Sequence, residues 1–433
     1  MQQPLILLEL NEINFDVAKL YIESGEKLDG FKRAFDGNLI VTRSEEIYEN
    51  LEPWIQWPSV HTGLSFQDHE IFRLGDIEKK YKKQIFEHIE QKGFLVGAIS
   101  PMNASNCLSN PAYFIPDPWT KTPTDGYWLS NIIYKSVAQS VNDNSEGKIS
   151  LKSLIFLISA SIFCVRFKKL VSLSFYALSC IKLRYRKALF LDKLLFEFHR
   201  YFFERKKPDF ATIFLNGGAH IQHHYFFNSK IFKSIQKNPD WYLNKEADPI
   251  LDMLKVYDEI LDELINNKNF ELIVATGLTQ EPYQNKEFYY RPKNHKRLFY
   301  ELEISFKDIE PRMTRDFLVS FDSEKDTEDA KKILSQLKVN DGVPLFNEIE
   351  KRENELFISL TYSNEIDKRT FVELNQKRIF LKDYVVFVAL KNGMHNSKGF
   401  AYFSEGVSEF APKQNSHVKN LFNTINSFFE SSL

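Results

Sequence analysis

Cysteine is scarce in this sequence. The 433 residues contain three cysteines, Cys107, Cys164 and Cys180, and no two of them have the CxxC spacing. An odd number of widely spaced cysteines argues against a disulfide framework and against a zinc knuckle. So few thiols fit a reducing compartment, and the first residues lack the basic, apolar and cleavage segments of a signal peptide. We therefore expect a cytoplasmic protein.

Long apolar runs are missing as well. The longest uncharged runs, Ser153 to Val165 and Leu170 to Ile181, have thirteen and twelve residues. A helix that crosses a bilayer needs about 18 to 20. These runs are therefore expected to lie on a membrane at most, and not to cross it.

The chain also has little net charge, −2, but this sum hides a local excess. Residues 151–207 hold thirteen Lys and Arg against three acidic residues, about +10. We expect this segment to form helices that contact an anionic membrane or a lipid-linked substrate, and the alternative is a buried helical pair with a solvated basic rim. A nucleic-acid partner is not expected. A 43% apolar and 15% aromatic content argues against disorder.

Apolar runs alternate with amphipathic stretches through the first 120 residues, which predicts strands alternating with helices. This pattern indicates an α/β fold with a mostly parallel sheet and helices on both faces. The predicted organisation is an α/β core in three parts, a basic helical insertion and a small α+β subdomain. The core parts are 1–120, 208–288 and 383–433, the insertion is 121–207, and the subdomain is 289–382.

Polar residues follow several of the predicted strands directly. Asn11 and Glu12 follow "LILLEL", Asn216 follows "FATIFL", and His395 comes after "YVVFVAL" in the turn "GMHNSKG". Ligands of such sheets bind beyond the carboxyl ends of the strands, so we expect these residues to share one cleft. Asn11 and Glu12 are candidate metal ligands, although Asn11 equally suits a helix N-cap.

The stretch "NGGAHIQHHYFF" gathers three histidines within five residues. His220 lies three residues before His223 and four before His224, so on a helix it shares a face with either. Neutral imidazole is a common ligand of divalent transition metals. A metal or phosphate role is favoured, and the alternative is a polar helix start whose histidines cap carbonyls or stack on neighbouring rings.

Two further stretches carry candidate residues. "EPWIQWPSVHTGL" offers Ser59, His61 and Thr62 near a helix start, where a hydroxyl could serve phosphoryl transfer, or where these residues could simply cap and pack. "YYRPKNHKR" suits a phosphorylated ligand or, equally, a solvated basic loop. Its candidate substrate-binding residues are Tyr290, Arg291, Lys293 and His295.

Together, the residues at the strand ends resemble the alkaline phosphatase superfamily, especially its type I phosphodiesterase and nucleotide pyrophosphatase branch. In that family a metal-binding Asp ends the first strand, a nucleophile precedes a "TG" step, and D-x-x-x-H, Asp-His and H-x-x-x-G motifs follow. The corresponding stretches here are Asn11, "VHTGLSFQDHEI", "NGGAH" with Asn216 and His220, "VATGL", and "HNSKG" with His395 and Gly399.

The sequence departs from this pattern at the metal sites. Both metal-binding aspartates are replaced, by Asn11 and Asn216, and the Asp-His pair is Gly277 and Leu278. Pro53 occupies the usual position of the nucleophile, ten residues before the "TG" glycine. The resemblance therefore implies one metal site rather than two.

The resemblance implies that Asn216, His220 and His395, helped by His223 or His224, hold one divalent metal, zinc or manganese. We expect a phosphodiesterase or phosphotransferase that acts on a sugar-phosphate or lipid-linked phosphate, in surface polysaccharide metabolism. One alternative is a metal-free protein that binds an anion or a glycan. Another is a glycan-modifying transferase whose histidines act as general bases.

Overall fold

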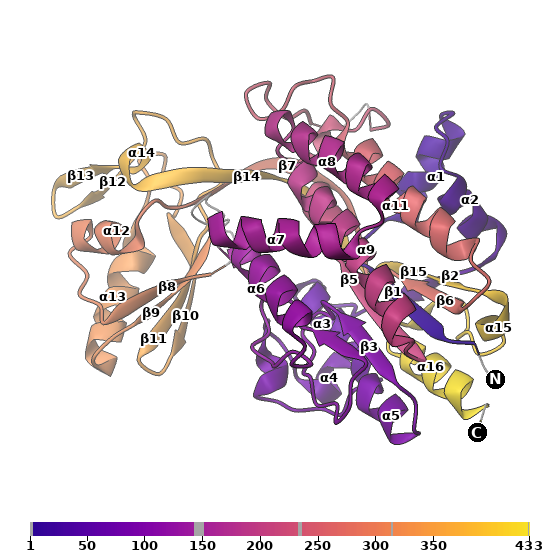
Figure 1. The fold of residues 1–433 in the computed structure, drawn as a ribbon. Coiled ribbons are helices and arrows are strands. Elements are labelled where there is room, and N and C mark those ends of the chain that lie inside the picture. Colours follow the sequence, from indigo (N-terminus) through magenta and orange to yellow (C-terminus); the bar gives the residue numbers. More distant parts are fainter. Residues whose placement is uncertain (1–2, 143–150, 233–235, 313–314, 432) are drawn as a thin grey trace. The chain divides into compact units, whose positions relative to one another are not determined.

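The computed structural model describes residues 3–142, 151–232, 236–312, 315–431 and 433. The chain divides into two compact units (Figure 1). The first unit comprises Met1–Pro282 and Gly393–Leu433, and the second is Tyr283–Asn392. The second unit begins before residue 289 and ends after residue 382, the predicted limits of the α+β subdomain.

The first unit is built on an eight-stranded sheet with the order β16-β2-β15-β6-β1-β5-β3-β4. Neighbouring strands pair in parallel, except that β15 runs antiparallel to both β2 and β6. The predicted α/β fold with a mostly parallel sheet is therefore confirmed. The strands are β1 (Leu5–Leu10), β2 (Asn38–Arg43), β3 (Val96–Ile99), β4 (Tyr113–Ile115), β5 (Phe210–Leu215), β6 (Glu271–Ala275), β15 (Lys398–Phe403) and β16 (Ser416–His417).

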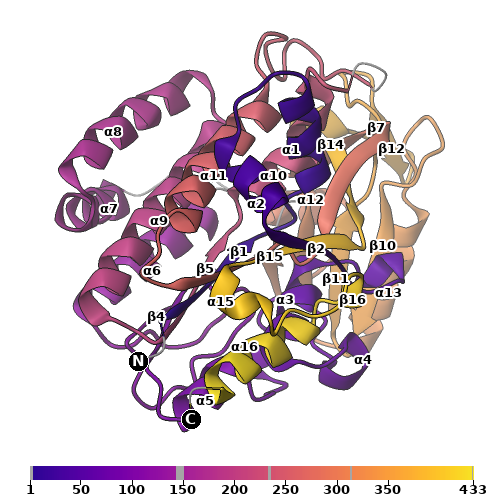
Figure 2. The same ribbon diagram turned by 90° about the vertical axis from the view of Figure 1, so that its right-hand side faces the viewer.

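Alternate residues of β1 enter two separate hydrophobic cores. Ile6, Leu8 and Leu10 belong to one core, and Leu5 and Leu7 belong to the other. Neighbouring side chains of a strand point to opposite faces of the sheet, so a strand that is apolar throughout must be covered on both. Figure 2 shows the helices above and below the sheet. They are α1 (Phe15–Glu23), α2 (Asp29–Asp36), α9 (Arg186–Lys206) and α11 (Pro249–Ile265) on the first core, and α3 (Pro53–Thr62), α5 (Ile85–Gln91) and α16 (Asn420–Glu430) on the second.

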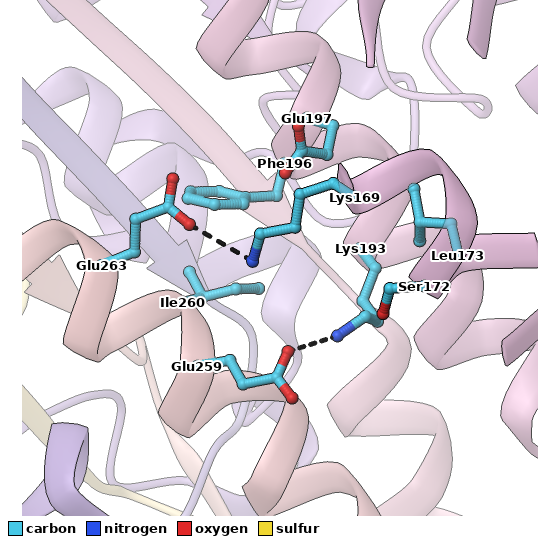
Figure 3. Close-up of a pocket in the computed structure, with 9 residues that line it drawn as sticks. All are labelled: Lys169, Ser172, Leu173, Lys193, Phe196, Glu197, Glu259, Ile260 and Glu263. Atoms are coloured by element: carbon cyan, nitrogen blue, oxygen red, sulfur yellow. Dashed lines mark hydrogen bonds and ion pairs between the residues drawn. The ribbon is translucent and has the colours of Figure 1, made fainter. Parts of the chain in front are cut away.

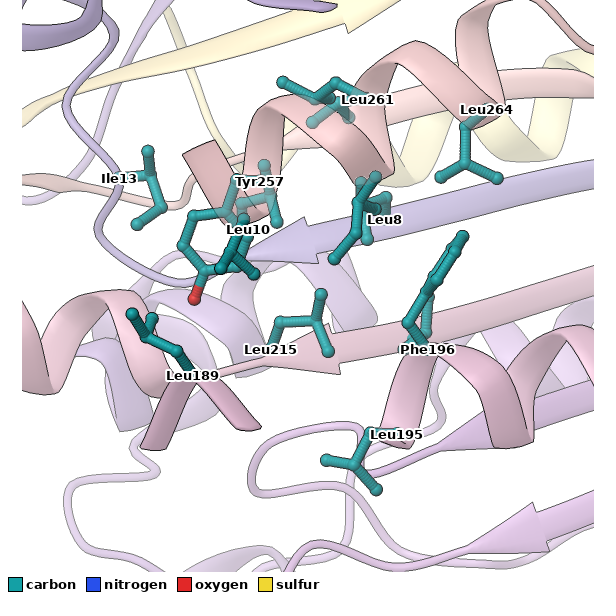
Figure 4. Packing of buried hydrophobic residues seen from close by; sticks show 14 of the residues in the cluster. Leu8, Leu10, Ile13, Leu189, Leu195, Phe196, Leu215, Tyr257, Leu261 and Leu264 are labelled. Atoms are coloured by element: carbon teal, nitrogen blue, oxygen red, sulfur yellow. The ribbon is translucent and has the colours of Figure 1, made fainter. Parts of the chain in front are cut away.

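The first core includes leucines from the sheet and from α11 (Figure 4). Leu8 and Leu215 of the sheet and Leu261 and Leu264 of α11 are all buried there. Burying one such side chain contributes about 2 kcal/mol. This packing fixes the ends of β1 and β5, where the site residues follow.

The predicted helical insertion is helical in its described residues. It contains α6 (Trp128–Asn142), α7 (Leu151–Cys164) and α8 (Phe167–Lys182), followed by α9. The described residues include no helix with the length and apolar character needed to traverse a membrane. The other helical segments of the first unit are η1 (Tyr48–Asn50), α4 (Phe66–His69), η2 (Asp76–Glu78), α10 (Gly217–Tyr225), η4 (Phe226–Asn228) and α15 (Glu405–Ser408).

The second unit contains an antiparallel four-stranded sheet of order β10-β11-β9-β8 and the hairpin β12-β13. The paired strands β7 (Thr279–Pro292) and β14 (Val385–Asn396) connect it in sequence to the first unit. Its other elements are α12 (His295–Glu301), β8 (Asp308–Pro311), β9 (Asp316–Ser320), α13 (Glu324–Gln336), β10 (Phe346–Arg352), β11 (Glu355–Leu360), β12 (Phe371–Leu374), β13 (Lys377–Phe380) and α14 (Leu381–Tyr384).

Candidate metal centre

The carboxyl ends of three central strands meet at one edge of the sheet. The Asn11 backbone amide donates to the Leu215 carbonyl at 3.1 Å, and the Glu12 amide donates to the Thr276 carbonyl at 3.1 Å. These bonds join the segments that follow β1, β5 and β6. Because β15 is antiparallel to β6, the residues that precede it, including His395, reach the same edge.

Glu12, His223 and His395 form a cluster of possible metal ligands at this edge. Glu12 Oε2 lies 3.1 Å from His223 Nε2 and 3.3 Å from His395 Nε2. The two imidazole Nε2 atoms are 3.4 Å apart. The Glu12 side chain is buried, that of His395 is 11% exposed and that of His223 is 33% exposed, so the cluster reaches solvent through His223.

These three separations match the geometry of a tetrahedral ion. Bonds of about 2.0 to 2.1 Å at tetrahedral angles place neighbouring ligand atoms about 3.4 Å apart. Two histidines and one glutamate are a known ligand set of catalytic zinc, with the fourth position left for water or substrate. The donor atoms of this chain therefore fit a single divalent metal.

Electrostatic coupling within the cluster is strong. Burial alone would raise the pKa of the Glu12 carboxyl, but the imidazoles of His395 and His223 outweigh it and hold that pKa far below its usual range. Burial acts to lower the pKa of His395, and the Glu12 carboxylate overcomes this effect and raises it. Glu12 is therefore ionised at neutral pH, as a metal ligand must be.

Two glutamines hold Glu12 in place. Its backbone has φ 62°, in the left-handed region that a glutamate rarely adopts. Gln222 Nε2 donates to the Glu12 carbonyl at 2.8 Å, and Gln280 Nε2 donates to Glu12 Oε2. Gly393 makes room for this arrangement, since a Cβ there would lie 2.1 Å from Gln280 Oε1 and 2.7 Å from the Gln222 carbonyl.

His395 is oriented from its other ring nitrogen. Its Nδ1 lies 3.8 Å from Glu52 Oε2, and the ring also interacts with the backbone of Leu51. Glu52 directly precedes α3. Nε2 of His395, which faces Glu12 and His223, is therefore the candidate ligand atom.

Asn11 is fully engaged in hydrogen bonds. Its Nδ2 donates to Asn216 Oδ1 at 2.8 Å and to Glu12 Oε1 at 3.2 Å, and its Oδ1 accepts from Trp57 Nε1 at 2.8 Å. Where the resembled family has two metal-binding aspartates, this chain has an amide-to-amide hydrogen bond. Asn11 and Asn216 thus border the cluster, and Glu12, the next residue, supplies the carboxylate.

The start of α10 is held by a second buried network. Asp192 Oδ2 accepts from the Gly217 amide at 2.8 Å and from the Tyr257 hydroxyl at 2.6 Å, and that hydroxyl accepts from the Gly218 amide at 2.6 Å. Burial raises the pKa of Asp192 to about 7. The first amides of the helix that carries His223 are therefore satisfied within the protein.

The residues predicted from "EPWIQWPSVHTGL" point into α3 or into the core. Ser59 Oγ donates to the Ile55 carbonyl and lies 3.0 Å from His69 Nε2. Because His69 Nδ1 accepts from a backbone amide, its Nε2 carries the proton and cannot activate Ser59 as a base. Thr62 Oγ1 donates to the Pro58 carbonyl at 2.7 Å. These hydrogen bonds fit the capping and packing alternative, and catalysis by Ser59, His61 or Thr62 stays a prediction.

His61 is fully buried. Its Nε2 lies 3.0 Å from Glu9 Oε1, and the Thr212 hydroxyl donates to the same Glu9 oxygen at 2.6 Å. Glu9 is also fully buried and faces away from solvent within the second core. The pair joins α3 to the sheet beneath the site.

Of the three clustered histidines, the described metal-ligand cluster contains His223. His220 is exposed, and its ring packs edge-on against that of His224 with the ring centres 4.9 Å apart. The sequence pairs His395 with His220, whereas the cluster of the structure pairs it with His223. Ligation by His220 and catalysis by His224 stay predictions.

The predicted substrate-binding residues lie in the second unit. Tyr290 is buried, its hydroxyl accepts from the Ile366 amide at 2.8 Å, and burial raises its pKa to about 12. Burial lowers the pKa of His295 to about 4, and its ring packs on Phe317. Lys293 donates to a backbone carbonyl at 2.7 Å, and Arg291 is partly buried. Their role in substrate binding stays a prediction.

Sequence reasoning missed Gln222, Gln280 and Glu52. Glutamine carries no motif signal, and these residues act by positioning Glu12 and His395 rather than by ligation. Glu52 had one available signal. It directly precedes Pro53, and Pro53 stands where the resembled family places its nucleophile.

No family model and no curated protein matches this sequence. Solved structures do match over 99% of the chain. They include a phosphonoacetate hydrolase from Sinorhizobium meliloti 1021 (10% identity, 96% of that chain, TM-score 0.42) and an alkaline phosphatase from the Antarctic bacterium TAB5 (9%, 99%, 0.40). Human ectonucleotide pyrophosphatase/phosphodiesterase 5 matches at 9% identity over 95% of its chain with a TM-score of 0.43.

Proposed function

We propose that this protein is a phosphate-ester hydrolase of the alkaline phosphatase type that works with one divalent metal ion. The observation that carries the proposal is the convergence of Glu12 Oε2, His223 Nε2 and His395 Nε2 at separations of 3.1 to 3.4 Å. Zinc is the first candidate because two histidines and a glutamate suit it, and manganese is the second.

When bound, the ion would polarise a phosphoryl oxygen and make water a stronger nucleophile. The residues of the chain hold and orient this arrangement. Glu12 supplies the negative charge, Gln280 fixes its carboxylate, and Glu52 faces His395 Nδ1 with a 30% exposed side chain. At 3.8 Å the Glu52 carboxylate is beyond hydrogen-bond distance, and it acts on the His395 ring through its negative charge.

Water, rather than a side chain, is the proposed nucleophile. Pro53 has no hydroxyl, and the Ser59 and Thr62 hydroxyls donate to carbonyls of their own helix. Attack by water transfers the phosphoryl group to water, so hydrolysis is favoured over transfer to a second substrate. A covalent phosphoenzyme is not part of this proposal.

A phosphodiester or a sugar-linked phosphate is the proposed substrate. Two metal ions can clamp both the attacking and the leaving oxygen, whereas one cannot. The second ion has no carboxylate ligand at Asn11, whose amide is fully hydrogen bonded, nor at Gly277 and buried Leu278. A phosphomonoester dianion should therefore be a poor substrate.

A lipid-linked or glycan phosphate is the finer proposal within this class. Its support is the basic excess of residues 151–207, which suits peripheral contact of a cytoplasmic enzyme with an anionic membrane. A place in surface polysaccharide metabolism belongs to the same proposal.

The test is a comparison of two chromogenic substrates with protein of measured metal content. Zinc-loaded protein should hydrolyse bis(p-nitrophenyl) phosphate faster than p-nitrophenyl phosphate. Glu12→Gln and His223→Ala should lower kcat/KM for the diester at least a hundredfold, while His220→Ala, on the exposed face of the same helix, should change it less than about threefold. Rapid turnover of the monoester, or full activity of both cluster variants, contradicts the proposal. Protein that neither binds metal nor hydrolyses either ester supports the anion- or glycan-binding alternative.

A further inference from the structure

The outer face of α8 exposes a stripe of large apolar side chains. Phe167, Phe175 and Ile181 are 80%, 70% and 79% exposed, and Val171 and Leu178 are exposed between them. Spacings of four, four, three and three residues put all five on one side of the helix. Scattered apolar residues are normal on a surface, but a contiguous stripe marks an interaction site.

Large apolar side chains are exposed on α7 as well. Ile158, Ile162 and Phe163 are each at least half exposed. Eight of the eighteen large apolar side chains that are exposed in the described residues therefore lie on α7 and α8. Figure 2 shows both helices outside α9 and α11, away from the sheet.

The inner face of α8 is fixed to the rest of the first unit. Leu173 and Cys180 are buried on it, and a small pocket lies between α8, α9 and α11 (Figure 3). Lys169 pairs with Glu263 at 3.5 Å on one side of this pocket, and Lys193 of α9 approaches a glutamate of α11 on the other. Ion pairs thus engage Lys169 and Lys193 on the inner face.

The outer face keeps its positive charge. Residues 151–191 contain eight Lys and Arg and no Asp or Glu. Among the described residues, ion pairs engage Arg166, Lys169 and Arg186 of these eight. Exposed basic residues that form no ion pair with a described residue are Lys168, Lys182, Arg184 and Lys187.

We propose that α7 and α8 dock on the surface of an anionic lipid bilayer, with the apolar stripe in the acyl boundary and these four basic residues against the headgroups. Lys168 and Lys182 are exposed on α8 itself, and Arg184 and Lys187 are exposed in the segment that follows it directly. Exposed apolar and basic side chains in one helical segment are what an interfacial helix combines. A second copy of the chain is a poorer occupant, because it would bring two faces without acidic residues together. This inference does not depend on the metal site.

Vesicle flotation of the full-length protein tests the proposal. Protein should float with vesicles of phosphatidylcholine containing 30% phosphatidylglycerol and stay at the bottom with phosphatidylcholine alone. Raising the salt from 0.1 to 0.5 M should weaken partitioning about tenfold or more, since it screens the basic residues. Equal binding to both vesicle types, or to neither, overturns the proposal.

Matched variants locate the contact. Reversal of the four outer basic residues (K168E, K182E, R184E, K187E) should abolish flotation. The same number of exposed, unpaired lysines reversed elsewhere in the first unit (K19E, K27E, K32E, K413E) changes the net charge equally and should leave at least half of the binding. Phe167→Ser with Phe175→Ser and Ile181→Ser should also abolish it. Equal loss in both charge variants, or a concentration-dependent dimer that the serine variant abolishes while flotation persists, contradicts docking through this face.

Discussion

His223 Nε2 and His395 Nε2 face each other at 3.4 Å although 172 residues separate them in the chain, and Glu12 Oε2 completes a triangle with them. Each atom has a lone pair or a proton directed to the same small space. Without a metal, the two imidazoles and the carboxylate share protons with one another. A bound metal would replace those protons and take the three atoms as ligands.

Zinc should stabilise the protein through these three residues. A ligand present at 100 times its dissociation constant adds about 2.7 kcal/mol to the free energy of unfolding. Thermal unfolding of chelator-treated protein with and without zinc measures this shift in Tm. His223→Ala and His395→Ala should abolish the shift in Tm, and His220→Ala should keep it. If only His220→Ala abolished the shift, His220 rather than His223 would be the ligand.

Gly393→Ala should disturb the cluster through Gln280. The added Cβ would lie 2.1 Å from Gln280 Oε1 and 2.7 Å from the Gln222 carbonyl, so the glutamine that fixes Glu12 must move. We expect a loss of about 1 to 3 kcal/mol in the free energy of unfolding and at least tenfold weaker zinc binding by calorimetry.

Gly75→Ala is the control for this variant. Its φ of +81° makes alanine strained, but the nearest atom to its Cβ is the Trp119 carbonyl at 3.6 Å. It should lose stability and keep its zinc affinity. Equal zinc affinity in both variants would show that Gly393 has no part in the site.

Asp192 should make stability depend on pH. Burial raises its folded pKa to about 7 from an ordinary value of 3.8, so between these values the native state binds more protons than the unfolded state. Its contribution to the free energy of unfolding is fully present below about pH 4 and is lost as the pH rises through about 7. Urea unfolding measures the free energy of unfolding of the wild type and of Asp192→Asn at each pH. The wild-type value minus the variant value should fall by roughly 2 to 4 kcal/mol over this range. A constant difference would contradict a raised pKa.

Glu9 and His61 should prove to be a structural pair. Leucine at position 9 leaves buried His61 Nε2 without its partner, and leucine at position 61 leaves buried Glu9 with Thr212 alone. Each change should cost about 2 to 4 kcal/mol in the free energy of unfolding, and the double variant should cost less than the sum of the two. A double-mutant cycle in urea measures this coupling. Diesterase kcat for each folded variant should stay within about threefold of the wild type, and its loss in stable His61→Leu protein would make His61 catalytic.

The central sheet and two of the three cluster residues could be predicted from the sequence. Apolar runs mark the strands and their ends, so the position of Glu12 follows from the rule that ligands bind beyond strand ends. His395 was expected in a turn beyond "YVVFVAL", but it lies within β14, outside the central sheet, and reaches the same edge because it precedes the antiparallel β15. The antiparallel direction of β15 could not be read in this way. It is set by pairing with β6 and β2, which are far away in the sequence.

The choice between His220 and His223 could not be made from spacing. The two residues lie about one turn apart on α10, and the position of this helix against α9 and α11 decides which of them reaches Glu12. The same limit applies to Ser59 and His61. Their partners, His69 and Glu9, are brought to them only by the folded chain.

The position of β15 in the middle of the sheet also determines when this protein can acquire its metal. A ribosome adds about 5 to 20 residues each second, so roughly 20 to 80 s pass between the synthesis of Glu12 and that of His395. During that time β1 lacks the strand pairing beyond β6, and Glu12 has no complete set of partners. A metal held by Glu12, His223 and His395 would therefore bind only once His395 has been made, and a nascent chain that ends before this residue would lack the complete ligand set.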